Sequence, residues 1–310
     1  MTIAAAGIAA PAGYEAARTG LAHRFREAGV FDVAGEGRAA FLQGQLTQDV
    51  ASLAAGQTLP AAALTAKGRL VFLARVIGLP DRIRLLVPAV ARAPALEHLR
   101  KYVVFQKVAI SDRSEDFVRI GLHGPDAARI AAGPEGFLLP AEGEFAAELL
   151  SPAADRAGVQ RRLESAGSVP VSPEAAVILR VEAGRPLFGQ DADSSHLPDE
   201  VGIDSSISTT KGCYVGQEIV ARMRTYGRAN RRLVGFRFPG GLVAPGSLLK
   251  RPEEETPGKI EQGRVTSAAG SPRLGAIGLG YAFREVAAGE RLVSSGDPSL
   301  DAIVAALPFA

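Results

Sequence analysis

Hydrophobic residues recur along the first two thirds of the chain at two different spacings. Spacings of three and four residues are typical of a helix that buries one face, whereas alternation is typical of a half-buried strand. The helical spacing predicts helices over residues 37–50, 91–102, 126–132, 172–182 and 217–223. The apolar runs predict strands over residues 30–33, 61–79 (a hairpin), 82–88, 103–111 and 117–122. This mixed order predicts an α+β fold with antiparallel sheets.

The pattern changes after Arg232. From there to the C-terminus, short alternating segments are separated by turns that are rich in glycine and proline. They predict strands over residues 233–238, 246–249, 258–267, 275–281 and 290–293. Such a series is typical of a small β-barrel or sandwich. We therefore predict two regions, an α+β region over 1–232 and a β-domain over 233–310.

Composition adds few restrictions. The chain is 47% hydrophobic and 22% charged, with a formal charge of +2, which indicates a globular protein without a dominant nucleic-acid surface. No apolar run reaches the length of about 20 residues that a membrane span needs, so we expect a cytoplasmic protein without membrane contact. With one cysteine and four histidines at no metal-binding spacing, the chain predicts no disulfide and no metal site of its own.

That single cysteine lies in the most informative stretch of the sequence. The stretch consists of Lys211, Gly212, Cys213, Tyr214, Val215, Gly216, Gln217 and Glu218. A neighbouring lysine and the positive end of the following helix would both favour the thiolate form. We therefore predict that Cys213 is alkylated faster than free cysteine, whereas the alternative is a structural cysteine in a glycine-rich turn. Glu218 and Arg222 are spaced to pair on the helix.

Five blocks in a fixed order carry a family resemblance. They are residues 41–50, 63–69, 180–191, 197–200 and 211–218. Together they resemble the YgfZ family, folate-binding relatives of the glycine-cleavage T-protein. The resemblance implies a ring of two α+β subdomains and a C-terminal barrel around a central hole. That hole would hold tetrahydrofolate or a one-carbon derivative.

The chemistry of a folate suggests which side chains would bind it. Glu182 could grip the pterin edge through two hydrogen bonds, and Tyr102 could stack on the ring. Arg222 and Arg228 could bind the carboxylates of the tail. Each assignment has a structural alternative: an exposed acid at a helix end, a core aromatic residue, and a solvated basic surface.

The T-protein relatives use an aspartate on the strand that follows the turn at 67–69. Here that strand reads Leu70, Val71, Phe72 and Leu73, and these side chains cannot transfer a proton. We therefore predict that the protein has no aminomethyltransferase activity.

The resemblance instead implies a folate-dependent accessory protein for the assembly or repair of iron–sulfur clusters. Its partners would be assembly factors or client enzymes, including radical-SAM enzymes that thiolate tRNA, and Cys213 would be the functional thiol. An alternative is a tetrahydrofolate-dependent one-carbon transferase with another substrate. A third and subordinate interpretation is direct tRNA binding through the basic segment 222–232.

Overall fold

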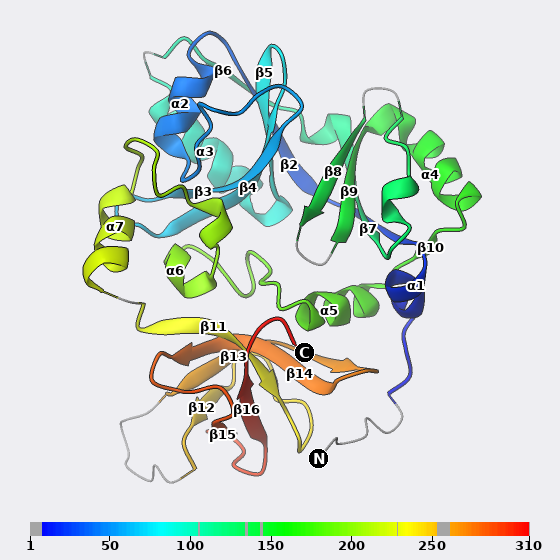
Figure 1. The fold of residues 1–310 in the computed structure, drawn as a ribbon, viewed down its shortest axis with the longest axis vertical. Coiled ribbons are helices and arrows are strands. Elements are labelled where there is room, and N and C mark those ends of the chain that lie inside the picture. Colours follow the sequence, from blue (N-terminus) through cyan, green and yellow to red (C-terminus); the bar gives the residue numbers. More distant parts are fainter. Residues whose placement is uncertain are drawn as a thin grey trace.

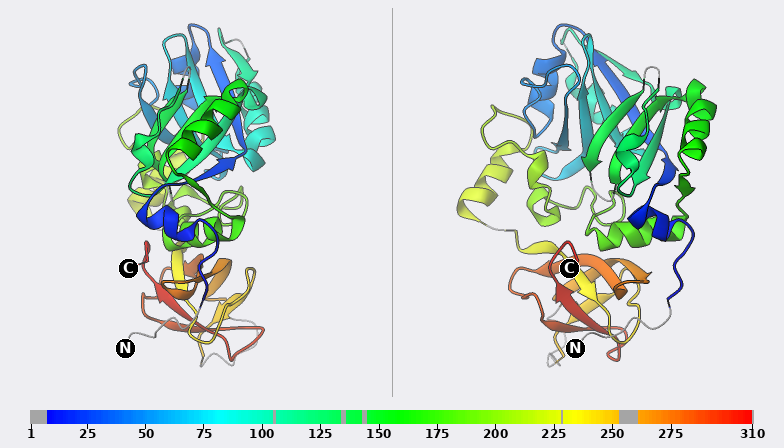
Figure 2. Two further views of the ribbon diagram at one scale, coloured as in Figure 1. Left: turned by 90° about the vertical axis from the view of Figure 1, so that its right-hand side faces the viewer. Right: turned by 45° about the vertical axis from the view of Figure 1, so that its right-hand side comes forward.

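The computed structural model describes residues 8–104, 106–133, 136–142, 145–227, 229–252 and 261–309. Its strands form two five-stranded sheets and one closed barrel (Figure 1). The sheets lie together at one end of the molecule and the barrel lies at the other, with helices between them (Figure 2). The α+β class with a C-terminal barrel is therefore confirmed.

The first sheet has the strand order β3-β4-β5-β2-β6. Its strands are β2 (Ala28–Ala34), β3 (Thr58–Leu64), β4 (Leu70–Gly78), β5 (Arg82–Pro88) and β6 (Ala109–Asp112). Helices α2 (Arg38–Gln45) and α3 (Arg92–Tyr102) pack on this sheet and bury Phe41, Leu42 and Leu99 against it. Their apolar faces therefore do what the helical spacing predicts.

The second sheet has the order β10-β1-β7-β9-β8. Its strands are β1 (Ala22–Arg26), β7 (Phe117–His123), β8 (Phe137–Glu142), β9 (Phe145–Pro152) and β10 (Val169–Pro170). Helix α4 (Arg156–Ser165) buries Val159 and Leu163 against it. Only Glu27 separates β1 from β2, so the chain passes from one sheet to the other at a single residue. A shared apolar cluster that includes Val30 and Leu150 joins the sheets.

Four helices connect the sheets to the barrel. They are α1 (Tyr14–Thr19), α5 (Pro173–Glu182), α6 (Pro198–Val201) and α7 (Gln217–Tyr226). Helix α5 begins with a Ser172 cap and buries one face against Ile277 and Leu279 of the barrel. Val201 of α6 and Val220 of α7 share a cluster with Leu70 of the first sheet. The part of the chain from α5 to α7, here called the connecting segment, thus places all three units around one centre.

The barrel closes in the order β11-β14-β13-β12-β15-β16. Its strands are β11 (Arg231–Arg237), β12 (Leu248–Lys250), β13 (Gly263–Ser271), β14 (Gly275–Phe283), β15 (Arg291–Ser294) and β16 (Asp301–Ala305). Phe236, Val265 and Leu292 fill its interior. Among the helices in the described ranges, none has the length and apolar character that a bilayer crossing needs.

Several of the sequence-based elements are wrong in extent or type. The strand predicted over 258–267 is β13, which begins at Gly263 and runs to Ser271, and residues 258–260 lie outside the described ranges. The helix predicted over 37–50 ends at Gln45, because Leu46 turns into extended backbone and forms a bridge with Ala63 of β3. The strand predicted over 103–111 is reduced to β6, and the helix predicted over 126–132 is one 3-10 turn. The sequence pattern also failed to indicate α1, α4, α6, β1, β8, β9, β10 and β16.

Candidate functional site

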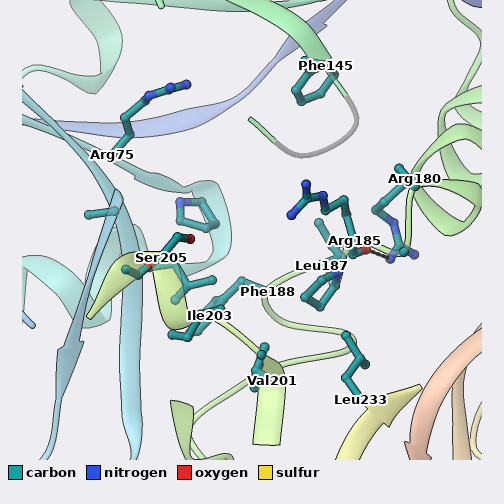
Figure 3. Close-up of a pocket in the computed structure, with 18 of the residues that line it drawn as sticks. Arg75, Phe145, Arg180, Arg185, Leu187, Phe188, Val201, Ile203, Ser205 and Leu233 are labelled. Atoms are coloured by element: carbon teal, nitrogen blue, oxygen red, sulfur yellow. Dashed lines mark hydrogen bonds between the residues drawn. The ribbon is translucent and has the colours of Figure 1, made fainter. Parts of the chain in front are cut away.

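A cavity of about 850 Å³ lies where the two sheets, the connecting segment and the barrel meet (Figure 3). The first sheet contributes Leu73 and Arg75, and the second contributes Phe145. The barrel contributes Leu233 and the C-terminal Leu307. Because every unit supplies part of the wall, the cavity depends on the complete ring of domains.

One side of the cavity is apolar. Leu187 and Phe188 follow helix α5, Val201 ends α6, Ile203 follows it, and Leu233 comes from β11 (Figure 3). Pockets of this size with an apolar wall and a few polar groups are typical of sites for small organic ligands. A flat heterocycle would find van der Waals contacts along this side.

Charged groups gather around Glu148 on the sheet side of the cavity. Its buried carboxylate accepts hydrogen bonds from Arg119 Nη2 at 2.7 Å and from Arg75 Nη1 at 3.4 Å. Arg26 Nη1 lies 3.7 Å from the other oxygen, Oε1. In the described part of the chain, that oxygen accepts no hydrogen bond although it is buried. A buried acceptor of this kind is costly unless a ligand or water donates to it.

Arg180 holds the segment that follows α5. Its buried guanidinium donates to Asp191 Oδ2 at 2.6 Å, to Ser267 Oγ at 2.8 Å and to the carbonyl oxygen of Arg185 at 2.8 Å. Ser267 belongs to the barrel, so this network ties the cavity wall to β13. With its donors engaged in this way, Arg180 supports the wall rather than presenting charge to a ligand.

Strand β4 presents no carboxylate to the cavity. Its lining residues are Leu73, Ala74 and Arg75, and the buried Phe72 belongs to the core of the first sheet. The only cavity carboxylate on the facing sheet strands β4, β5, β7 and β9 is Glu148, which three arginines surround. A proton acceptor on β4 is therefore missing from the wall.

The signature stretch is anchored to helix α2 instead of to the cavity. Lys211 Nζ donates to the carbonyl oxygens of Gln43, Leu46 and Gln48 at 2.6, 2.6 and 3.0 Å. The backbone N–H of Val215 donates to Gly44 O at 3.1 Å. Burial lowers the pKa of Lys211 to about 8, while the charge of Asp49 opposes this shift. The ammonium therefore satisfies carbonyls at the end of α2.

Two glycines let this stretch pack closely against the turn of the first hairpin. Gly216 has a φ of 85° and begins α7, and a side chain there would meet Thr65 O at 2.6 Å. Gly68 has a φ of 72°, and a side chain there would meet Ile219 Cβ at 2.8 Å. Gly212 lies in open space and needs no such freedom. Of the two glycines in the signature stretch, only Gly216 therefore makes a close approach to the hairpin turn.

Cys213 is exposed, so its thiol is open to solvent and partners. It precedes the start of α7 and does not belong to the residues that line the cavity. Tyr214 is buried, and the centroid of its ring lies 5.0 Å from Lys211 Nζ. Gln217 and Glu218 form the first turn of α7, and Glu218 makes the predicted pair with Arg222 at 2.7 Å.

The predicted folate ligands do not meet in the cavity. Glu182 points to Tyr14, whose hydroxyl donates to Oε1 at 2.6 Å, and it also accepts from Ser271. Tyr102 packs beside His98 in the core of the first sheet. Arg222 lies on the outer surface of α7. None of these three residues lines the cavity, and Arg228 lies outside the described residues.

The basic segment also differs from the surface that its sequence indicates. Arg224 pairs with Asp199 at 3.2 Å and Asp204 at 2.7 Å, and Arg231 pairs with Glu200 at 2.8 Å. Arg232 donates to backbone carbonyls of the barrel. In the described part of this segment, RNA phosphates would have to compete with these intramolecular partners for the arginines.

Sequence reasoning missed most of the charged cavity residues. Arg75, Arg119 and Glu148 each lie in a strand that is otherwise mostly apolar, and that isolation was the available signal. Arg185 stood inside the block 180–191 but was not singled out, because its neighbours did not reveal which way it points.

The fold has known relatives. An aminomethyltransferase of Rubrobacter xylanophilus is 32% identical over 343 aligned residues, which cover 100% of this chain and 88% of that protein. The tRNA-modifying protein YgfZ of Cronobacter sakazakii is 30% identical over 239 residues, covering 69% and 68%. Aminomethyltransferase T of the glycine cleavage system from Bartonella henselae superimposes with a TM-score of 0.84 at 20% identity, covering 96% and 88%. No family model matches.

The two sheets, the barrel and the central cavity define a protein of the T-protein fold class. Within that class, the chain belongs to the YgfZ family, which is related to the glycine-cleavage T-protein.

Proposed function

We propose that this protein is a cytoplasmic folate-binding accessory protein. It would support the assembly or repair of iron–sulfur clusters in client enzymes, including enzymes that thiolate tRNA. In this proposal the central cavity holds tetrahydrofolate or a one-carbon derivative, and Cys213 is the thiol that meets a partner.

The cavity carries the proposal. Its volume of about 850 Å³ lies within the range of roughly 300–1,000 Å³ that is usual for small-ligand sites. An apolar side suits a pterin ring, and arginines suit the carboxylates of a folate tail. Glu148 Oε1 is a buried acceptor that receives no hydrogen bond from the described residues. The N–H groups of a pterin could satisfy it.

Two further features favour an accessory role over a transferase. Strand β4 supplies no carboxylate to the cavity, so the chain lacks a proton acceptor at that place. Cys213 is exposed and lies outside the cavity lining, where another protein can reach it. A single thiol cannot hold a cluster alone, so a partner would have to supply further ligands.

Two experiments test the proposed function, one of ligand binding and one in cells. Tetrahydrofolate should bind the purified protein in calorimetry under anaerobic conditions, and Cys213→Ser should bind it with unchanged affinity. In a strain that lacks the gene and has weakened cluster enzymes, the wild-type protein should restore their activity and the serine variant should not. Full restoration by Cys213→Ser would remove the thiol from the proposal, and absence of folate binding would remove the cavity.

A one-carbon transferase remains the second candidate, because the similarity to an aminomethyltransferase extends over the whole chain. This candidate predicts methylene-tetrahydrofolate formation when the protein is mixed with tetrahydrofolate and an aminomethylated lipoyl carrier protein. We expect no formation above the level without protein. Turnover at enzymatic rates would replace the accessory role.

A further inference from the structure

Among the arginines of the cavity, Arg185 has a special position. On the basis of the proposed folate site, we propose that Arg185 binds the glutamate carboxylates of the ligand's tail. It would make the protein select folates over pterins that lack glutamate. The sequence-based candidates for this role, Arg222 and Arg228, do not supply it: Arg222 lies on an outer helix surface, and Arg228 lies outside the described residues.

The backbone of Arg185 is held on both sides. Its N–H donates to Arg180 O at 3.1 Å, and its carbonyl oxygen accepts from Arg180 Nη1 at 2.8 Å. Gly184 before it has a φ of 66°, and Pro186 after it restricts Arg185 to extended backbone. Arg180 is itself fixed by Asp191 and Ser267. The root of the Arg185 side chain therefore has one defined place on the cavity wall.

The head group of Arg185, in contrast, has no fixed partner. Among the described residues, none gives its guanidinium a hydrogen bond or an ion pair. Figure 3 shows the side chain leaving the segment after α5 and extending its nitrogens into the open centre, toward the side of Phe145. Its root lies beside the apolar Leu187 and Phe188. A planar cation with five donors is thus presented to whatever enters the cavity.

Other arginines of the lining have defined contacts. Arg180 is engaged in the network described above, and Arg232 donates to the carbonyl oxygens of Arg284 and Val286. Arg119 makes an ion pair with the buried Glu148 at 2.7 Å. An incoming carboxylate would have to compete with these partners, whereas at Arg185 it displaces only water. Arg185 is therefore the cation of the wall that can take a bidentate carboxylate at the lowest cost.

The test compares two ligands that differ only in the glutamate. Tetrahydrofolate and tetrahydropteroate are titrated by anaerobic calorimetry into the full-length protein, into Arg185→Leu and into Arg185→Lys. Arg129→Leu is the matched control, because Arg129 is exposed, pairs only with Asp126 among the described residues and does not line the cavity. Thermal unfolding of each variant shows that it is folded, and the exposure of the Arg185 side chain makes a large effect on folding unexpected.

We expect the wild-type protein to bind tetrahydrofolate about 10- to 100-fold more tightly than tetrahydropteroate, as the loss of a charge-assisted pair implies. Arg185→Leu should remove this preference, Arg185→Lys should restore part of it, and Arg129→Leu should keep it. A preference that survives in Arg185→Leu, or its absence from the wild type, would overturn the inference and leave the folate site intact. Failure of both ligands to bind the wild type would overturn the proposed function as well.

Discussion

The ammonium nitrogen of Lys211 lies 2.6 Å from the carbonyl oxygen of Leu46, just beyond the end of helix α2. Carbonyls at a helix C-terminus lack partners within the helix, and a cation there also meets the negative end of the helix dipole. The contact joins two sequence blocks that are 165 residues apart. The lysine of the signature stretch therefore has a structural role, and its donors point to carbonyls rather than to the thiol of Cys213.

Removing this ammonium group should destabilise the protein. In Lys211→Met, the carbonyl oxygens of Gln43, Leu46 and Gln48 lose their shared donor in a partly buried place. We expect the free energy of unfolding to fall by about 1–3 kcal/mol, which is typical of a buried polar group left unsatisfied. Urea titration followed by circular dichroism measures it. Lys67→Met is the control, because Lys67 is exposed, and equal stabilities of the two variants would contradict the prediction.

Glu182 should be important for stability and unimportant for folate affinity. Its carboxylate joins α5 to Tyr14 of α1 and Ser271 of β13. Burial raises the pKa of Tyr14, and the hydrogen bond to Glu182 raises it further. In Glu182→Ala both hydroxyl groups lose their acceptor, so we expect a loss of about 2–4 kcal/mol in the free energy of unfolding.

A double-mutant cycle separates the partners in this network. Tyr14→Phe removes only the hydroxyl that contacts Glu182 Oε1 at 2.6 Å. Combined with Glu182→Ala, it should show a coupling energy of roughly 1–2 kcal/mol, because the two side chains share one contact. The folded Glu182→Ala protein should bind tetrahydrofolate as tightly as the wild type. A large loss of affinity without a loss of stability would return Glu182 to the ligand site that its sequence position suggested.

Cys213 should be accessible in the native protein. Because the residue is exposed, we expect a chromogenic disulfide reagent to label it without denaturant at least as fast as it labels the urea-unfolded chain. The unfolded chain serves as the internal control because it contains the same single thiol. A labelling rate in the native protein at least ten times lower than in the unfolded chain would show that the thiol is sequestered.

The sequence could predict elements whose pattern is strong and local. Strand β5 has the predicted bounds, and helix α5 begins after the serine that caps it. The helix predicted over 126–132 is wrong because the same apolar spacing also suits a turn that packs against α4. Ile130 does this by joining the cluster of Val159 and Leu163. Local spacing carries no information about which neighbour arrives from elsewhere in the chain.

The same limit explains the candidate site. Glu182 and Arg185 are three residues apart, yet one turns to α1 and the other lines the cavity. Their orientations depend on where α5 ends and on the positive φ of Gly184, and no sequence motif predicts either feature. Glu148 receives one of its three arginine partners, Arg75, from the other sheet. A site built by three domains becomes visible only when their packing is known.

His98 should make stability depend on pH in the acidic range. It lies between Phe72 and Tyr102, with ring centroids at 6.0 and 5.0 Å. Burial lowers its pKa to about 4, and the charge of Lys101 contributes in the same direction. The unfolded chain binds a proton near its ordinary value of about 6.5, so between these values the unfolded state holds more protons. Stability therefore rises with pH between about 4 and 6.5 and is lost as the pH falls.

Replacing this imidazole should remove that contribution. Relative to the wild type, His98→Leu should gain about 1–2 kcal/mol in the free energy of unfolding when the pH falls from 7.5 to 4.5, a value reduced for partial exposure. Urea titrations of both proteins at several pH values measure the difference. Carboxylates that titrate in the same range act on both proteins and cancel in that difference. A stability difference that stays constant across the range would show that His98 is protonated equally readily in the folded and unfolded states.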